Sequence, residues 1–194
     1  MMDIILTPIE ARVLGSLIEK QITTPDYYPL TLNSLTNACN QKSNRDPVMN
    51  LDDKTVVRAV DELRDKQLIW QIRPAGSRSS KYEHNMKKAF KFSPEEISVL
   101  CELLLRGPQT VGELRGRTAR LYKFDDLSEV ETTLEGLMSR EGDPFVVKLP
   151  RQTGRKERRY MHLFCGEIEV DEESELPPLE RARLEVIAEN ERIA

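Results

Sequence analysis

Two stretches decide the fold: Thr7-Pro8-Ile9-Glu10, followed by Val13, Leu14, Leu17 and Ile18, and Ser93-Pro94-Glu95-Glu96, followed by Val99, Leu100, Leu103 and Leu104. Every residue of the second stretch lies 86 positions after its counterpart in the first. Each stretch begins with a hydroxyl N-cap, a proline in the first turn and a glutamate at N3, which is the pattern of a capping box. Apolar residues then follow at helical spacing. We therefore expect two equivalent helices, one opening each half of the chain.

The next two helices also have counterparts, at slightly shorter offsets. Thr31 to Leu35 corresponds to Thr110 to Leu114, and each stretch predicts a short second helix. A longer apolar pattern at i, i+4 and i+7 predicts third helices near 53–66 and 128–140. Its residues are Val56, Val60 and Leu63 in the first half and Val130, Leu134 and Leu137 in the second.

A β-rich run and a polar loop follow each third helix. Residues 68–73 and 81–84 flank one glycine-containing loop, and residues 145–149 and 158–164 flank the other. Such pairs of runs are typical of β-hairpins. The return strands carry the pairs Tyr82 with His84 and Tyr160 with His162, which we expect to share a strand face and to pack against the helices. Three helices and a hairpin form the winged-helix plan, so the sequence predicts a mainly α fold with small hairpins (α+β), made of two tandem winged-helix domains that each close a small core.

The predicted domains are residues 1–90 and 91–166, followed by an acidic tail at 167–194. The boundary falls in residues 85–92, where 86–90 could form a short helical linker. The tail holds 10 acidic and 3 basic residues, a net charge of −7, whereas the two domains carry about +3 and 0. We expect disorder in its first part, whereas 181–193 could form a short helix that supports self-association.

Composition excludes several classes of protein. The chain lacks a basic leader with an apolar run of signal-peptide length and has no apolar stretch of about 20 residues, so we expect a soluble cytoplasmic protein. Three cysteines are far apart in sequence, and Cys101 lies at helical spacing with core leucines, which favours a buried thiol. With only His84 and His162 as histidines, we expect no metal site and no small-molecule cofactor.

Four stretches resemble the YceH family of bacterial proteins. They are TPIEARVLGSLIEK from Thr7, CNQKSNRDPV from Cys39, VVRAVDELRDKQLI from Val56 and GPQTVGELRGR from Gly107. The resemblance covers about residues 5–165. It implies a fold of two winged-helix domains, and no catalytic or metal-binding residue, because the family has no assigned biochemical role.

DNA binding is the first functional hypothesis, since a recognition helix of this fold reads the major groove while a wing touches phosphate. The candidate contacts in the first half are Arg45, Lys54, Thr55, Arg58, Arg78 and Lys81. Acidic residues on the same third helix reduce the attraction of this surface for phosphate.

The second half separates the charges more clearly. Its third helix presents Glu129, Glu131 and Glu135, which suit a phosphate-lined groove poorly. Its wing holds five cations against Glu157, namely Arg151, Arg155, Lys156, Arg158 and Arg159. This wing is either a phosphate contact or a solvated loop.

The alternative is a protein-interaction module, either a scaffold or a homodimer, because fold does not fix function. The polar loop 40–47 has two interpretations as well: local turn formation by Asn44 and Asp46, or a contact patch led by Lys42 and Arg45. No sequence motif of a nucleotide-binding, hydrolase or zinc-protease site is present, so we expect no enzymatic activity.

Overall fold

The computed structural model describes residues 4–73, 76, 79–140, 144–152 and 154–166. The predicted tail, 167–194, lies outside these residues. In the described part the first half contains α1 (Pro8–Thr23), η1 (Pro25–Tyr27), β1 (Leu30–Thr31), α2 (Leu32–Cys39), α3 (Asp53–Asp65), β2 (Ile69–Ile72) and β3 (Lys81–His84). Then follow α4 (Met86–Phe90), α5 (Pro94–Arg106), α6 (Val111–Thr118), α7 (Leu127–Met138), β4 (Val146–Lys148) and β5 (Tyr160–His162). The mixed α and β content is confirmed, and both halves follow the order of three helices and an antiparallel strand pair.

Both predicted capping boxes are present. The Glu10 amide donates to the Thr7 hydroxyl at 3.2 Å, and the Thr7 amide donates to the Glu10 carboxylate at 2.6 Å. Ser93 and Glu96 form the same reciprocal pair at 3.2 and 2.9 Å. Each box satisfies amide groups that a helix start leaves without a partner, which fixes where α1 and α5 begin.

The sheets contain one strand that the sequence analysis missed. The three-stranded sheet has the order β1-β3-β2, with Leu30 opposite Tyr82 and Ile69 opposite His84, and β4 pairs with β5. In the second half, Gln109 forms an isolated bridge with Tyr160. Leu30 and Gln109 each precede the threonine that caps the following helix. The return strands β3 and β5 therefore pair with corresponding segments of their own halves.

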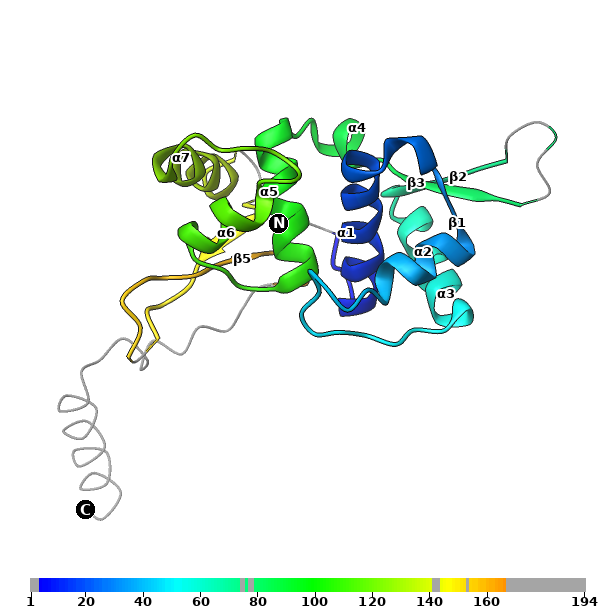
Figure 1. Cartoon of the computed structure of the whole chain (residues 1–194), viewed down its shortest axis with the longest axis horizontal. Coiled ribbons are helices and arrows are strands. Elements are labelled where there is room, and N and C mark those ends of the chain that lie inside the picture. Colours follow the sequence, from blue (N-terminus) through cyan, green and yellow to red (C-terminus); the bar gives the residue numbers. More distant parts are fainter. Residues whose placement is uncertain (1–3, 74–75, 77–78, 141–143, 153, 167–194) are drawn as a thin grey trace, which may run out of the picture.

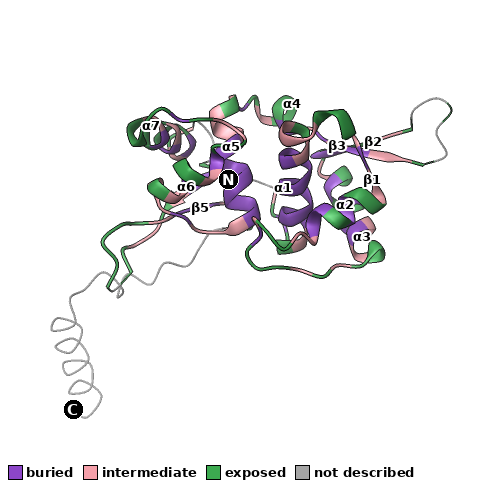
Figure 2. Ribbon diagram, viewed as in Figure 1, coloured by how far each residue is buried: buried purple, intermediate pink, exposed green. Residues whose placement is uncertain are grey.

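The two halves share one continuous core, which differs from the expectation of two separate ones. Buried apolar residues from Leu6 to Phe164 form a single cluster. Figure 1 shows α1 and α5 side by side in the middle of the molecule, with the β2–β3 and β4–β5 hairpins extending toward opposite ends. Figure 2 shows both helices buried over much of their length. Separate cores are excluded because α1 is covered on one side by its own half and on the other by α5.

Gly15 lets α1 and α5 approach closely. A Cβ at this position would lie 3.0 Å from Cγ and Cδ2 of Leu105 and 3.1 Å from Cβ of Leu104. The buried thiol of Cys101 donates to the Gly15 carbonyl, with Sγ and O 3.4 Å apart. These two residues are 86 positions apart, the same offset that relates the two first helices in the sequence.

The short helix α4 fixes the connection between the halves. Phe90 at its end packs against Phe145 of the second half, with ring centroids 5.1 Å apart, and Phe92 packs against the same ring at 4.9 Å. The Arg140 guanidinium donates to the Phe90 carbonyl and to the Glu96 carboxylate. The predicted linker helix is therefore present, and it packs against the second half.

We predict that Gly15→Val destabilises the protein by about 1–3 kcal/mol, because the added isopropyl group has no room at the α1–α5 contact. Urea unfolding followed by circular dichroism measures the change. Gly136→Ala is the matched control, since a Cβ at this helical glycine meets nothing within 4 Å; it should stabilise α7 by up to about 1 kcal/mol. Equal unfolding midpoints for Gly15→Val and the wild type would contradict the close packing.

Candidate functional site

The exposed stripe of α3 is basic at its beginning and acidic at its end. Lys54 and Arg58 are both exposed and lie one turn apart, whereas Asp61 and Asp65 follow along the same stripe. Thr55 is half-buried beside them. The end that carries the cations is the end from which helix-turn-helix proteins contact DNA bases.

Two acidic side chains at the start of α3 have internal partners. Asp52 is the N-cap, and its carboxylate accepts a hydrogen bond from the Thr55 amide at 2.8 Å. Hydrogen bonds with the Thr55 side chain and with the Thr55 amide lower the pKa of Asp52. Asp53 accepts from the Thr36 hydroxyl at 2.6 Å. Both carboxylates therefore serve the junction between α2 and α3.

A groove of about 400 Å³ lies between the segment before α1 and one side of α3. We call it the α3 groove, and it is lined by Ile5, Leu6, Thr7, Ile9, Glu10, Thr55, Arg58, Ala59, Glu62 and Lys66. Lys66 bridges it by donating to the Glu10 carboxylate at 2.5 Å. Two of the predicted nucleic-acid contacts, Thr55 and Arg58, thus border an apolar hollow.

The loop between β4 and β5 presents the densest group of cations described in the second half. Arg151, Arg155, Lys156 and Arg158 are exposed, and Arg159 is half-buried. A second cavity of about 230 Å³ lies where this loop meets the first turns of α6 and α7. Its lining combines the cations Lys148 and Arg158 with Glu131, Glu157 and apolar side chains.

The exposed face of α7 is acidic, as the sequence predicted. Glu131 and Glu135 point to solvent, and Leu127 is 48% exposed at the first turn. Glu129 has local partners instead, because it accepts from the Tyr122 hydroxyl at 3.0 Å and from the Asp125 amide at 2.8 Å. The third helices of the two halves therefore present surfaces of different charge.

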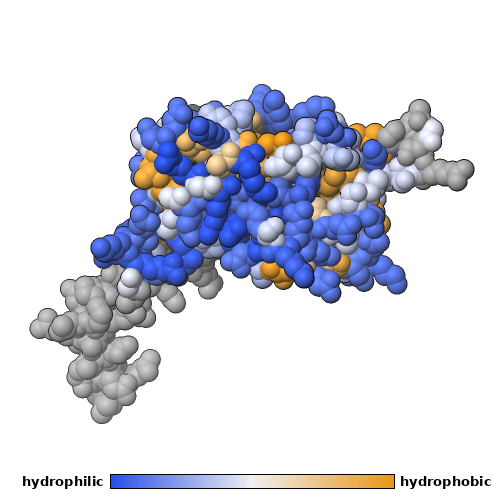
Figure 3. All heavy atoms as spheres, viewed as in Figure 1, coloured by the Kyte–Doolittle hydropathy of each residue, from blue (hydrophilic) through white to orange (hydrophobic). Residues whose placement is uncertain are grey.

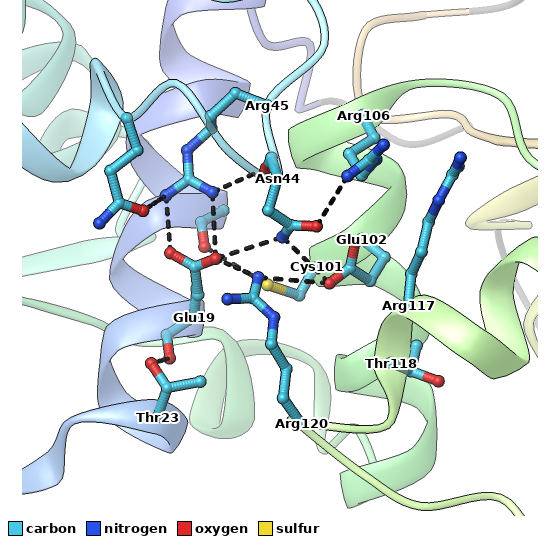
Figure 4. A network of polar contacts seen from close by, with 12 residues as sticks. Glu19, Thr23, Asn44, Arg45, Cys101, Glu102, Arg106, Arg117, Thr118 and Arg120 are labelled. Carbon is cyan, nitrogen blue, oxygen red and sulfur yellow. Dashed lines mark hydrogen bonds and ion pairs between the residues drawn. The ribbon is translucent and has the colours of Figure 1, made fainter.

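A buried cluster of charges lies where the two halves meet (Figure 4). Arg45 and Glu19 form an ion pair at 2.6 Å in which both side chains are fully buried. Arg45 also donates to the Ala38 carbonyl at 2.8 and 3.1 Å, so that it closes the end of α2. Burial raises the pKa of Glu19, but the hydrogen bond and the charge of Arg45, together with the charge of Arg120, outweigh it and hold that pKa at about 2.

The same cluster extends into the second half. Asn44, in the left-handed region at φ 55°, donates to Glu19 at 3.3 Å and to Glu102 at 3.2 Å. Its side-chain oxygen accepts from Arg106 at 3.0 Å. Arg120 pairs with both carboxylates. Burial raises the pKa of Glu102 more than Asn44 and Arg120 lower it.

Arg12 provides a second link of this kind. Its buried guanidinium donates to the carbonyls of Cys39 at 3.1 Å, Pro47 at 2.6 Å and Leu105 at 3.5 Å. Cys39 ends α2, and Leu105 is in the last turn of α5, so one cation stands against the negative ends of two helices. These contacts join the halves through backbone groups.

The family model and the relatives that this chain matches identify one family. Residues 6–155 match the family model described as "Protein of unknown function, DUF480". The chain belongs to the DUF480 family. A UPF0502 protein of Geotalea daltonii is 57% identical over 192 residues, covering 99% of this chain and 87% of the relative. UPF0502 proteins of Geobacter sulfurreducens and Photobacterium profundum are 54% and 52% identical, covering 100% and 88% of this chain and 87% and 78% of theirs.

Membership of the DUF480 family confirms the resemblance found in the sequence, and it specifies no ligand. Among the described residues no helix is both long enough and apolar enough to cross a lipid bilayer.

The structure corrects one candidate of the sequence analysis in this DUF480 protein. Arg45 is 5% exposed and belongs to the buried cluster, so it does not form a surface patch with Lys42. Arg78 lies outside the described residues. The remaining candidates are exposed or half-buried. Lys54, Thr55 and Arg58 lie on α3, Lys81 lies on β3, and the other five lie on the β4–β5 loop.

Four charged residues at the junction were not predicted from the sequence, namely Arg12, Glu19, Glu102 and Arg120. A signal for them is present in α1, where Arg12, Ser16 and Glu19 form a polar stripe at i, i+4 and i+7. All three are buried, because this stripe faces α5 and the 40–47 loop.

We predict that Arg45→Ala lowers the free energy of unfolding by about 3–5 kcal/mol, because it leaves the buried Glu19 without its main partner. Lys42→Ala, in the same loop but exposed, should change stability by less than about 0.5 kcal/mol. Chemical denaturation of both variants at pH 7 provides the measurement. Equal effects of the two substitutions would contradict the role assigned to Arg45.

Stability should also fall in weak acid, because burial lowers the pKa of His84 and of His162 to about 4. The unfolded chain binds protons at these groups below about pH 6.5, while the folded protein does not until about pH 4. The stabilisation that follows from keeping both histidines neutral is complete above about pH 6.5. As the pH falls toward 4, the free energy of unfolding decreases by up to about 3 kcal/mol per histidine. Urea titrations at pH 7, 5.5 and 4 measure this slope, and His84→Gln should reduce it. An unchanged slope in that variant would assign the acid sensitivity to other groups.

Proposed function

We propose that this chain is a non-catalytic, cytoplasmic protein of two tandem winged-helix domains, residues 1–90 and 91–166, that binds double-stranded DNA. The observation that carries the proposal is the cation-rich β4–β5 loop, in which four of the five cations are exposed. Binding to the phosphate backbone requires such positive side chains at the surface, where they displace condensed counterions.

The repeated order of elements supports the tandem arrangement. Gly15 and Cys101 occupy equivalent positions at the offset of 86 and contact each other. Contact between equivalent residues is what a two-fold axis produces in a homodimer. We interpret the α1–α5 contact as the internal equivalent of such a dimer interface.

The two halves would bind DNA differently. In the first half, Lys54 and Arg58 at the beginning of α3 are suited to the major groove, with Lys81 near the phosphates. In the second half, Glu131 and Glu135 oppose entry of α7 into a groove. The second domain would therefore contact phosphate through its wing alone, which contributes affinity without sequence readout.

The acidic face of α7 supports a second candidate function, docking of a protein partner. Leu127, 48% exposed beside Glu131, offers an apolar contact with an acidic rim. Such a surface fits a basic protein segment better than DNA. Leu127 and Glu131 line the same cavity as Arg158, so a partner docked on this face would lie next to the cations of the β4–β5 loop.

We predict salt-sensitive binding of labelled duplex DNA, measured by fluorescence anisotropy at 50 and 200 mM salt. The double variant Arg155→Ala with Lys156→Ala should weaken binding about tenfold and flatten the dependence of log affinity on log salt by about 2, one unit for each lost phosphate contact. Lys42→Ala with Lys123→Ala removes two exposed cations elsewhere and is the matched control.

Arg58→Ala should in addition reduce any preference among duplex sequences, since base contacts specify and phosphate contacts position. Absence of salt-sensitive binding at micromolar protein would reject DNA as the ligand. Capture of a partner that is lost in Leu127→Asp would then support the protein-docking function.

A further inference from the structure

The α3 groove is an apolar surface that nothing in the described part of the chain covers. Ile5 at its edge is 61% exposed, although it is a large apolar side chain. Ile9 and Ala59 continue the apolar lining into the groove. An exposed isoleucine beside a hollow of about 400 Å³ is the kind of feature that marks a docking site.

The described part of the second half ends beside this groove. The Leu6 amide donates to the Phe164 carbonyl at 2.6 Å, and Leu6 lines the groove. Cys165 follows, and its pKa is raised by burial and by the charge of Glu10, another residue of the lining. The chain therefore leaves Gly166 within a few residues of the mouth of the α3 groove.

The residues that come next have a composition that fits this surface. Residues 167–194 contain the run Leu176-Pro177-Pro178-Leu179, with acidic residues on both sides. Leu176 is ten residues after Gly166, and a chain of that length spans up to about 33 Å. The segment is thus long enough for its two leucines to reach the groove.

Charge at one end of the α3 groove favours the same occupant. Two carboxylates also line the groove, Glu10, which pairs with Lys66, and Glu62, so the positive charge lies at the end that Arg58 and Lys54 form. Arg58, at the rim of the groove, is exposed and forms no ion pair within the described ranges, and Lys54 lies one turn before it. The segment 167–194 carries a net charge of −7. Opposite charges at the rim guide docking, while burial of leucine provides the larger share of the free energy.

We propose that the acidic segment 167–194 of the same chain docks in the α3 groove, with Leu176 and Leu179 against Ile5, Ile9 and Ala59. Because Thr55 and Arg58 border the groove, the docked segment shields part of the surface to which we assign DNA binding. This consequence for DNA rests on the proposed function, whereas the docking itself does not. The segment then acts as an internal competitor of phosphate.

The test uses the full-length chain with a photoreactive phenylalanine derivative placed at Leu176 or at Leu179. After irradiation, mass spectrometry should find cross-links within one chain to residues 5–10 and 55–62. Ile5→Asp, a change at an exposed position, should lower their yield at least fivefold. Val48→Asp is the matched control, since Val48 is 55% exposed and is not part of the groove lining, and it should leave the yield unchanged.

Three outcomes would overturn docking: cross-links to other elements from both positions, covalent dimers as the main product, or the same yield in Ile5→Asp as in Val48→Asp. DNA titration of the same variants without the probe tests the shielding. Ile5→Asp should raise DNA affinity several-fold relative to Val48→Asp, and an unchanged affinity overturns the shielding. A protein that binds no DNA but gives the expected cross-links disproves the proposed function and retains the docking.

Discussion

The structure depends on the close contact between α1 and α5. Gly15 provides the space for it, because any side chain there would meet Leu104 and Leu105. The contact merges two sets of apolar residues into one core, and it brings the charged residues of both halves together around Glu19. Everything at the ends of the molecule, including both hairpins, is positioned by this central pair of helices (Figure 1).

The sequence predicts the local elements well, because their causes are local. The capping boxes at Thr7 and Ser93 and the glycine-containing hairpin loops act over a few residues, and the structure contains each of them. The junction was not predictable in this way. Arg12 and Glu19 have the spacing of an exposed polar stripe, and only partners from 25 to more than 90 residues away make their burial favourable.

For the candidate site too, the sequence predicts what depends on local position and not what depends on distant partners. Exposure of Lys54, Arg58 and the β4–β5 cations follows from their positions in the pattern, since charged side chains seldom lie in a core. Arg45 is the exception, because a buried carboxylate and the end of α2 compensate its charge. The α3 groove arises from two segments about 50 residues apart, which no periodicity links. Figure 3 shows a largely hydrophilic face on which apolar residues emerge in scattered areas.

Joining two similar halves in one chain has a consequence for the contact between them. In a symmetric homodimer, a residue at the interface is present twice. A glutamate placed like Glu19 would therefore bring a second buried negative charge to the symmetry-related position. Here the residue 86 positions later is Leu105, which packs on Gly15 and offers its carbonyl to Arg12. A single chain can thus place unlike residues at corresponding positions, a buried glutamate on one helix and a leucine on the other, which no pair of identical subunits can do.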